Sequence, residues 1–317
     1  MSMLKKNVLY KSASGKDTVH GYVYTQEGVQ PKAILQISHG MCEYIGRYED
    51  FAEFLTESGY VVCGNDHLGH GETSSDGGED GFFAEKGGAN FVLQDLHQMT
   101  KEVKALYPGL PLFLMGHSMG SFFARKYAVT YPQELTGGLI ISGTGGPNPL
   151  AGVGIRLASL IKKIKGSHYH SKMINNMAFG AYCKRFENPL TEYDWVSSDK
   201  KTIETYTADP KCMFTFTVSA FYDMLITNAS VNRESWASGL DVDVPIYIFS
   251  GGMDPVGDYG EGVKKVYNYV KNAGVKDVSY KLYDKGRHEM LNEVNRKDVY
   301  SDVLNWLNAH LQEAVKG

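Results

Sequence analysis

Residues 116–120, Gly-His-Ser-Met-Gly, place a serine midway between two glycines. An apolar run over 112–115 leads into this segment, and a stretch with helical periodicity follows it over 121–131. On a sharp strand-to-helix turn, the serine hydroxyl is exposed beside the helix N-terminus, where developing negative charge is stabilised. Flanking glycines permit the strained backbone of such a turn. We therefore predict that Ser118 is a nucleophile rather than part of a structural turn.

A serine hydroxyl needs a neighbouring base, because on its own it is a poor nucleophile. Among the ten histidines, His288 directly follows the last strand-like run of the chain. Loops of this kind lie at the carboxyl edge of a parallel sheet, where catalytic groups gather. His310 lies within a helical pattern, and we expect it at the surface. His288 is the predicted base.

The turn around Ser118 resembles the nucleophile elbow of the α/β-hydrolase fold, in which the chain order is serine, acid, histidine. Asp254 lies in this interval, at the end of a strand and turn over 246–253. Asp258, four residues later, is the competing carboxylate. We favour Asp254, which completes a predicted triad with Ser118 and His288.

The tetrahedral intermediate of acyl transfer needs two backbone N–H donors directed at its oxyanion. One is predicted to be the amide of Met119, the residue after the nucleophile. The other should come from the loop after the third strand, residues 39–43, where we choose Met41.

Apolar runs alternate with helical patterns from residue 33 onwards, which is typical of a parallel sheet covered on both faces. Two strands, 7–12 and 19–25, are predicted before this point. The later predicted strands are 33–38, 60–64, 112–115, 138–141, 245–250 and 278–283, and the predicted helices between and after them are 48–58, 90–107, 118–131, 262–273 and 295–314. The fold class is therefore α/β, with a mostly parallel sheet.

One interval breaks this alternation. Residues 147–238 contain helical patterns rich in Tyr, Phe and Met but no strand-like run, and a crossover between parallel strands needs only about a dozen residues. We predict that they form an inserted helical cap, called the insertion below. The predicted core then comprises 1–146 and 239–317.

Metal or cofactor chemistry is not expected. Asp66, His67 and His70 suggest a metal pair, but no third ligand lies nearby in the sequence, so a shaped loop beside the site is the favoured interpretation. The four cysteines form no C-x-x-C pair. Cys42 follows Met41, so its thiol is expected near the acyl pocket, where either sensitivity to a bulky maleimide or a buried, inert thiol is consistent with the sequence.

The 317 residues are 43% apolar and 21% charged with a net charge of −4, so no global positive field attracts nucleic acid. No segment has signal-peptide or membrane-spanning character, and we expect a cytoplasmic protein. Residues 154–165 are basic and amphipathic, which allows transient contact with an anionic membrane surface, although packing on the core is the favoured alternative. No pattern specifies an oligomeric state.

Several motifs together resemble monoacylglycerol lipases and bacterial lysophospholipases of the serine aminopeptidase S33 type. Residues 39–48 resemble their H-G-x-G-E-H-x-x-R-Y loop, residues 65–71 their N/D-x-x-G-H-G loop, and 116–120 and 250–254 match further motifs. The chain departs from this pattern at Cys42, usually Gly, and at Tyr44, usually His. The departures affect the shape of the acyl pocket rather than the triad.

The resemblance implies hydrolysis of lipid esters with one acyl chain, such as monoacylglycerols or lysophospholipids, without a cofactor. Other serine esterases, thioesterases, acyltransferases and proline-type aminopeptidases remain alternatives, because fold does not determine function. Dehalogenases and epoxide hydrolases need a carboxylate where this chain has Ser118. A ligand-binding pseudoenzyme is the non-enzyme alternative, and its expected mark, a broken triad, is absent from the sequence.

Overall fold

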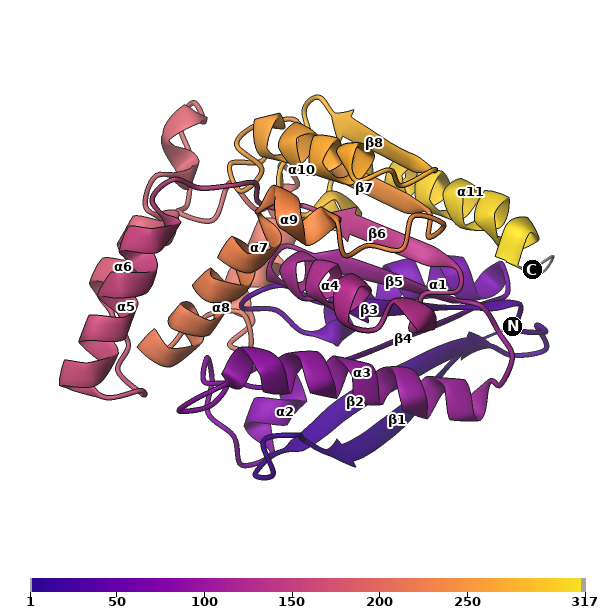
Figure 1. The fold of residues 1–317 in the computed structure, drawn as a ribbon, viewed down its shortest axis with the longest axis horizontal. Helices are drawn as coiled ribbons and strands as arrows, with labels where there is room; N and C mark the ends of the chain where they lie inside the picture. The colour runs from indigo at the N-terminus through magenta and orange to yellow at the C-terminus, as the bar shows by residue number, and fades with distance from the viewer. Residues whose placement is uncertain (1, 315–317) are drawn as a thin grey trace.

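A mostly parallel sheet of eight strands lies at the centre of the computed structural model, which describes the backbone of residues 2–314 and the side chains of residues 2–311. The strand order is β1-β2-β4-β3-β5-β6-β7-β8 (Figure 1). The strands are β1 (Met3–Lys11), β2 (Thr18–Gln26), β3 (Ala33–Ser38), β4 (Tyr60–Asn65), β5 (Leu112–His117), β6 (Gly138–Ser142), β7 (Ile246–Gly251) and β8 (Val278–Tyr283). The pairs β1–β2 and β2–β4 are antiparallel, and the other pairs are parallel.

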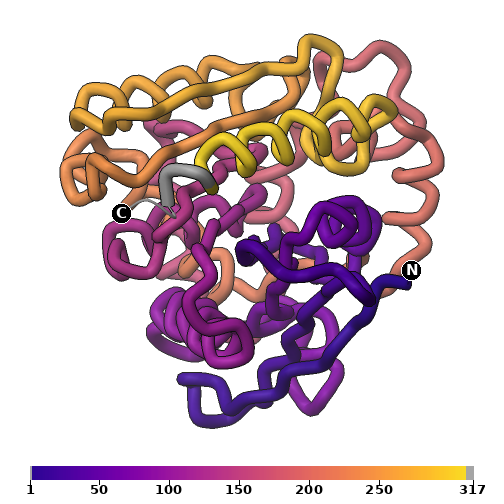
Figure 2. Tube along the Cα trace, turned by 90° about the vertical axis from the view of Figure 1, so that its right-hand side faces the viewer, coloured from indigo at the N-terminus to yellow at the C-terminus, as the bar shows by residue number. Residues whose placement is uncertain are grey.

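Helices cover both faces of the sheet, as the alternating pattern predicts. One face carries α1 (Glu49–Glu57) and α11 (Arg296–Ala314), and the other carries α3 (Gly88–Leu106), α4 (Met119–Thr130) and α10 (Glu261–Asn272) (Figure 1). Alternate side chains of a strand enter different cores, so Ile34 packs with α3 and α4 while Leu35 packs with α1 and α11. Figure 2 shows the N-terminal strands and the C-terminal elements at opposite ends of the molecule.

The predicted elements are present, but their ends differ from the predicted bounds, and the structure has one additional short helix before α3. The strand β5 continues to His117 and α4 begins at Met119, so Ser118 lies between the two elements. The short helix α2 (Gly71–Ser75) was not predicted. The expectation that His310 lies at the surface was wrong. His310 is buried, with Nδ1 2.7 Å from the Trp306 carbonyl oxygen and Nε2 3.1 Å from the Asp277 carboxylate.

Between β6 and β7 the described chain forms helices and one isolated bridge. The helices are α5 (Ala151–Lys165), α6 (Lys172–Phe179), a 3-10 turn (Tyr182–Arg185), α7 (Lys200–Ala208), α8 (Val218–Val231) and α9 (Glu234–Ala237). Helix α8 packs against α3, α4 and α5, whereas α5 and α6 lie farthest from the sheet, at the left of Figure 1. None of the helices that the structure describes combines the length and the hydrophobicity that a membrane-spanning segment needs.

Candidate active site

Ser118 occupies a strained turn between β5 and α4. Its backbone angles are φ 53° and ψ −122°, a conformation that costs a non-glycine residue about 1–3 kcal/mol. The glycines of the motif leave room for the chain on both sides of this turn, as predicted. A Cβ atom on Gly116 would lie 2.6 Å from that of Ala124, and one on Gly120 would collide with the Ser38 carbonyl oxygen. The glycines therefore permit close approach of helix and strand, and the serine itself carries the strain.

His288 and Asp254 lie within hydrogen-bond distance of each other. His288 Nδ1 is 3.0 Å from Asp254 Oδ2, and both side chains are buried. Burial alone would lower the pKa of His288, but the charge of Asp254 and the hydrogen bond to it outweigh burial and raise that pKa. Asp254 also accepts from Ser250 Oγ and the Val256 amide. Asp258, the competing carboxylate, is exposed and has a left-handed backbone.

The three predicted triad residues follow β5, β7 and β8, whose parallel pairing brings their carboxyl ends to one edge of the sheet. The ring of His117, the residue before Ser118, lies 4.7 Å from the ring of His288. Within the described residues, the hydrogen bonds of Ser118 use its backbone atoms, and none joins its hydroxyl to His288. Such catalytic contacts are often long without substrate and tighten in the complex.

The two predicted oxyanion donors belong to segments that meet at Ser118: Met119 follows it in the chain, and Met41 lies in the loop after β3. The first N–H groups of a helix lack intrahelical partners, and Met119 is the first residue of α4. A Cβ on Gly40, the residue before Met41, would lie 3.0 Å from Ser118 Cβ. Neither methionine amide donates to a backbone carbonyl in the part of the chain that the structure describes.

The backbone of Cys42, the next residue in this loop, has the left-handed conformation, with φ 54°. That conformation explains physically why a glycine suits this position, because glycine adopts positive φ without a steric penalty. The Cys42 thiol is buried and donates to the Phe214 carbonyl oxygen at 3.2 Å. Burial raises its pKa well above the ordinary value.

A buried ionic cluster behind these loops was not predicted. Arg47 donates through both Nη atoms to the Glu289 carboxylate, at 2.5 and 2.7 Å, and Nη1 lies 3.5 Å from Glu43. Glu43 in turn accepts from the Gly40 amide and the Tyr48 hydroxyl. Burial raises the pKa of Glu43, and the neighbouring Glu289 raises it further. The sequence signal was present, because charged residues stand in the 39–48 loop and directly after His288.

The sequence profile of the serine aminopeptidase S33 family of hydrolases matches residues 29–295. The chain belongs to this family. The monoacylglycerol lipase of Mycolicibacterium smegmatis is 26% identical over 291 residues, covering 89% of this chain and 90% of that protein. The monoglyceride lipase of Rattus norvegicus is 25% identical over 292 residues, covering 92% and 86%.

Among solved structures, a thermostable carboxyl esterase from Bacillus coagulans, in complex with glycerol, is similar with a TM-score of 0.92. It is 33% identical, and the alignment covers 98% of this chain and 100% of that chain. The fold is the α/β-hydrolase fold and the chain is a serine hydrolase, which confirms the prediction from the motifs.

In this S33 hydrolase, one segment of residues 147–238 contacts the His288 loop directly. The amides of His288 and Glu289 donate to the carbonyl oxygens of Trp195 and Val196, at 3.3 and 2.8 Å. The Trp195 ring lies 5.1 Å from the His288 ring. Sequence periodicity could not reveal this pairing, since its two partners are far apart along the chain.

The loop with Asp66, His67 and His70 forms hydrogen bonds with the segment after β3, beside the site. Asp66 accepts from the amides of Ile45 and Glu72, and the His67 amide donates to His39 Nε2 at 2.9 Å. Burial lowers the pKa of His67 to about 3 and that of His70 to about 4, so both rings are neutral at pH 7. No group of three or more His, Cys, Asp or Glu side chains that could hold a metal ion occurs among the described residues.

Proposed function

We propose that this S33 hydrolase cleaves carboxylic esters of lipids with a single acyl chain, such as monoacylglycerols or lysophospholipids. The observation that carries the proposal is the buried His288–Asp254 hydrogen bond at the sheet edge where Ser118 occupies its strained turn. The similarity over most of the chain to proteins named monoacylglycerol and monoglyceride lipases supports the substrate class.

In the proposed mechanism, Ser118 Oγ attacks the ester carbonyl carbon while His288 Nε2 takes the hydroxyl proton. His288 Nδ1–H donates to Asp254, which holds the tautomer and stabilises the imidazolium. The Met41 and Met119 amides donate to the oxyanion. The intermediate collapses, the protonated His288 gives its proton to the leaving alcohol, and the acyl group remains on Ser118. Water, activated by His288, then releases the fatty acid.

We further propose that the insertion, residues 147–238, is a cap that supplies an apolar wall for the acyl chain. Its Trp195 lies against the His288 ring, and its Phe214 carbonyl accepts from the Cys42 thiol beside Met41. A wall of this kind favours longer acyl chains, because each buried methylene contributes about 0.8 kcal/mol. A narrow pocket for one chain would exclude triacylglycerols.

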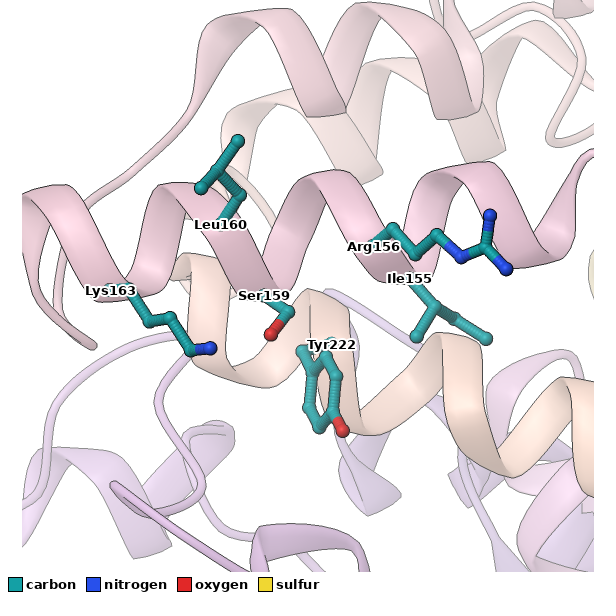
Figure 3. A pocket seen from close by; sticks show the side chains of 6 residues that line it. All are labelled: Ile155, Arg156, Ser159, Leu160, Lys163 and Tyr222. Atoms are coloured by element: carbon teal, nitrogen blue, oxygen red, sulfur yellow. The ribbon is translucent and has the colours of Figure 1, made fainter.

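The outer surface of the insertion suits transient contact with an anionic membrane. Large apolar side chains of α5 and α6 are exposed, among them Ile164 at 69% and Met177 at 59%. A surface pocket of about 350 Å³ between α5 and α8 is lined by Arg156 and Lys163 of α5 and by Tyr222 of α8 (Figure 3). A helix with exposed apolar and basic side chains binds the headgroup region of anionic bilayers.

Cosedimentation with phosphatidylglycerol vesicles tests this contact. Wild-type protein should bind, and binding should weaken at high salt and in Ile164→Glu. Equal binding to phosphatidylcholine and phosphatidylglycerol vesicles would contradict the electrostatic part of the proposal.

A panel of monoacylglycerols of graded chain length, with an N-terminal prolyl amide as the competing substrate, tests the function. We expect kcat/KM to rise at least about tenfold from acetyl to octanoyl, because six methylenes are added. Ser118→Ala serves as the inactive control. A flat profile, or faster cleavage of the prolyl amide, would favour the esterase or aminopeptidase alternatives.

A further inference from the structure

Arg125 on α4 is fully buried. Among the described side chains, no carboxylate contributes to the shift of its pKa. Burial lowers its pKa to about 9, and its Nε has no hydrogen-bond partner in that part of the chain. Removing a cation from water without an anionic partner is expensive. The contacts of its guanidinium must therefore offset that cost.

Those contacts join two segments that are distant in the sequence. Arg125 Nη1 lies 3.4 Å from both the Thr144 hydroxyl and the Gly145 carbonyl oxygen. Nη2 donates to the Val231 carbonyl oxygen and, at 3.1 Å, to Asn232 Oδ1. Residues 144–145 follow β6 just before the insertion, and residues 231–232 end its helix α8. One side chain therefore holds both ends of the insertion, called its roots below.

Helix α4, which bears Arg125, also links these contacts to Ser118. The Ser121 hydroxyl lies 2.7 Å from the Thr144 hydroxyl and donates to the Ser118 carbonyl oxygen at 2.5 Å. At the other root, the Trp236 ring lies 4.4 Å from the guanidinium, and its indole N–H donates to the Arg125 carbonyl oxygen at 2.8 Å. Arg125 follows Ser118 by two helical turns, so the elbow and both roots share one rigid support.

We propose that Arg125 is a positioning residue that clamps both roots of the insertion to the nucleophile helix and so holds the acyl-binding wall in register with Ser118. The proposal rests on the insertion acting as the acyl-binding cap. Only a planar fork of several donors reaches both roots at once, which a lysine ammonium cannot reproduce. The carbonyls at the C-terminus of α8 carry partial negative charge that favours a cation.

Alkyl fluorophosphonates with a short or a long chain test the proposal, because they label the active serine without needing ester turnover. The quantity to compare is the ratio of the long-chain to the short-chain labelling rate. We expect Arg125→Met to lower this ratio at least about fourfold, the factor that corresponds to lost contact with one methylene. Arg125→Lys should give a smaller fall. A folded Arg125→Met protein with the wild-type ratio would overturn the proposal.

Asp95→Asn is the matched control for general destabilisation. Asp95 is buried on α3, where it accepts from the Ser12 hydroxyl and the Ala13 amide in the turn between β1 and β2. The Asp95→Asn substitution should lower Tm but leave the ratio of the two labelling rates unchanged. Equal slowing of both probes in Arg125→Met would indicate a merely structural role and would also overturn the proposal.

Two further measurements keep the test decisive. If Arg125→Met does not fold, Asn232→Ala removes one acceptor of Nη2 and should lower the ratio in the same direction. An unchanged ratio in folded Asn232→Ala would then overturn the clamp. Wild-type protein that is labelled at Ser118 but cleaves no monoacylglycerol would defeat the proposed function, while the effect of Arg125 on the ratio could still be read.

Discussion

Arg47 and Glu289 form a bidentate ion pair that joins the loop after β3 to the loop that carries His288. Both side chains are nearly buried, at 11% and 7% exposure. The guanidinium also lies 4.8 Å from the ring of Tyr206, in α7 of the insertion. Three separate segments therefore meet at one cation behind the proposed oxyanion site.

Loss of this cation should destabilise the fold. Arg47→Met leaves Glu43 and Glu289 buried without their partner, and we expect the free energy of unfolding to fall by about 3–5 kcal/mol. Urea denaturation measures this quantity. Arg296→Met is the control, because its pair with Asp199 at 3.3 Å is partly exposed and should contribute less than about 1 kcal/mol. Equal effects of the two variants would contradict a special role for Arg47.

The two candidate acids should differ sharply. Asp254→Asn removes the acceptor that fixes the His288 tautomer, and we expect kcat to fall by about 10⁴. Asp258 is exposed, so Asp258→Asn should leave kcat within about a factor of two. Steady-state hydrolysis of a medium-chain monoacylglycerol measures both. The reverse ranking would show that the acid is Asp258.

The proposed nucleophile and the proposed base should each be indispensable. Ser118→Ala and His288→Ala should each lower kcat by about 10⁴ or more, and the double variant should be little worse, because residues that act as a unit are not additive. A fluorophosphonate that still labels Ser118→Ala would point to another nucleophile.

The pH profile should report the raised pKa of His288. In the proposed mechanism His288 must be neutral to accept the serine proton, so kcat/KM should fall as the pH decreases through a pKa above the ordinary histidine value of about 6.5. The charge of Glu289 contributes to the shift, so Glu289→Gln should move this acidic limb to lower pH. A limb that stays in place in Glu289→Gln would contradict the assignment to His288.

Cys42 should react slowly with maleimide. Its thiol is buried, its pKa is raised by burial, and only the thiolate is nucleophilic. The structure thus favours the inert alternative of the two that the sequence left open. Mass spectrometry should find partly exposed Cys183 labelled first, without loss of activity. Inhibition that Cys42→Ala abolishes would restore the reactive alternative.

Local pattern alone determined the alternation of strands and helices and the strand-to-helix turn at Ser118. The hydrophobic period of a segment depends on its own residues, so β5 and α4 could be predicted within two residues of their ends. The positions of Asp254 and His288 followed from chain order and from the rule that loops after parallel strands share one edge. The hydrogen bond between them is a geometric fact that the structure added.

Tertiary structure alone decided which distant side chains meet. Arg47 and Glu289 are separated by 242 positions, and Arg125 and Asn232 by 107, and no local period relates the members of either pair. The burial of His310 and of the Cys42 thiol likewise depends on what packs over them. Local backbone preference acts through neighbours in sequence, whereas burial and ion pairing act through neighbours in space, which only the closed fold specifies.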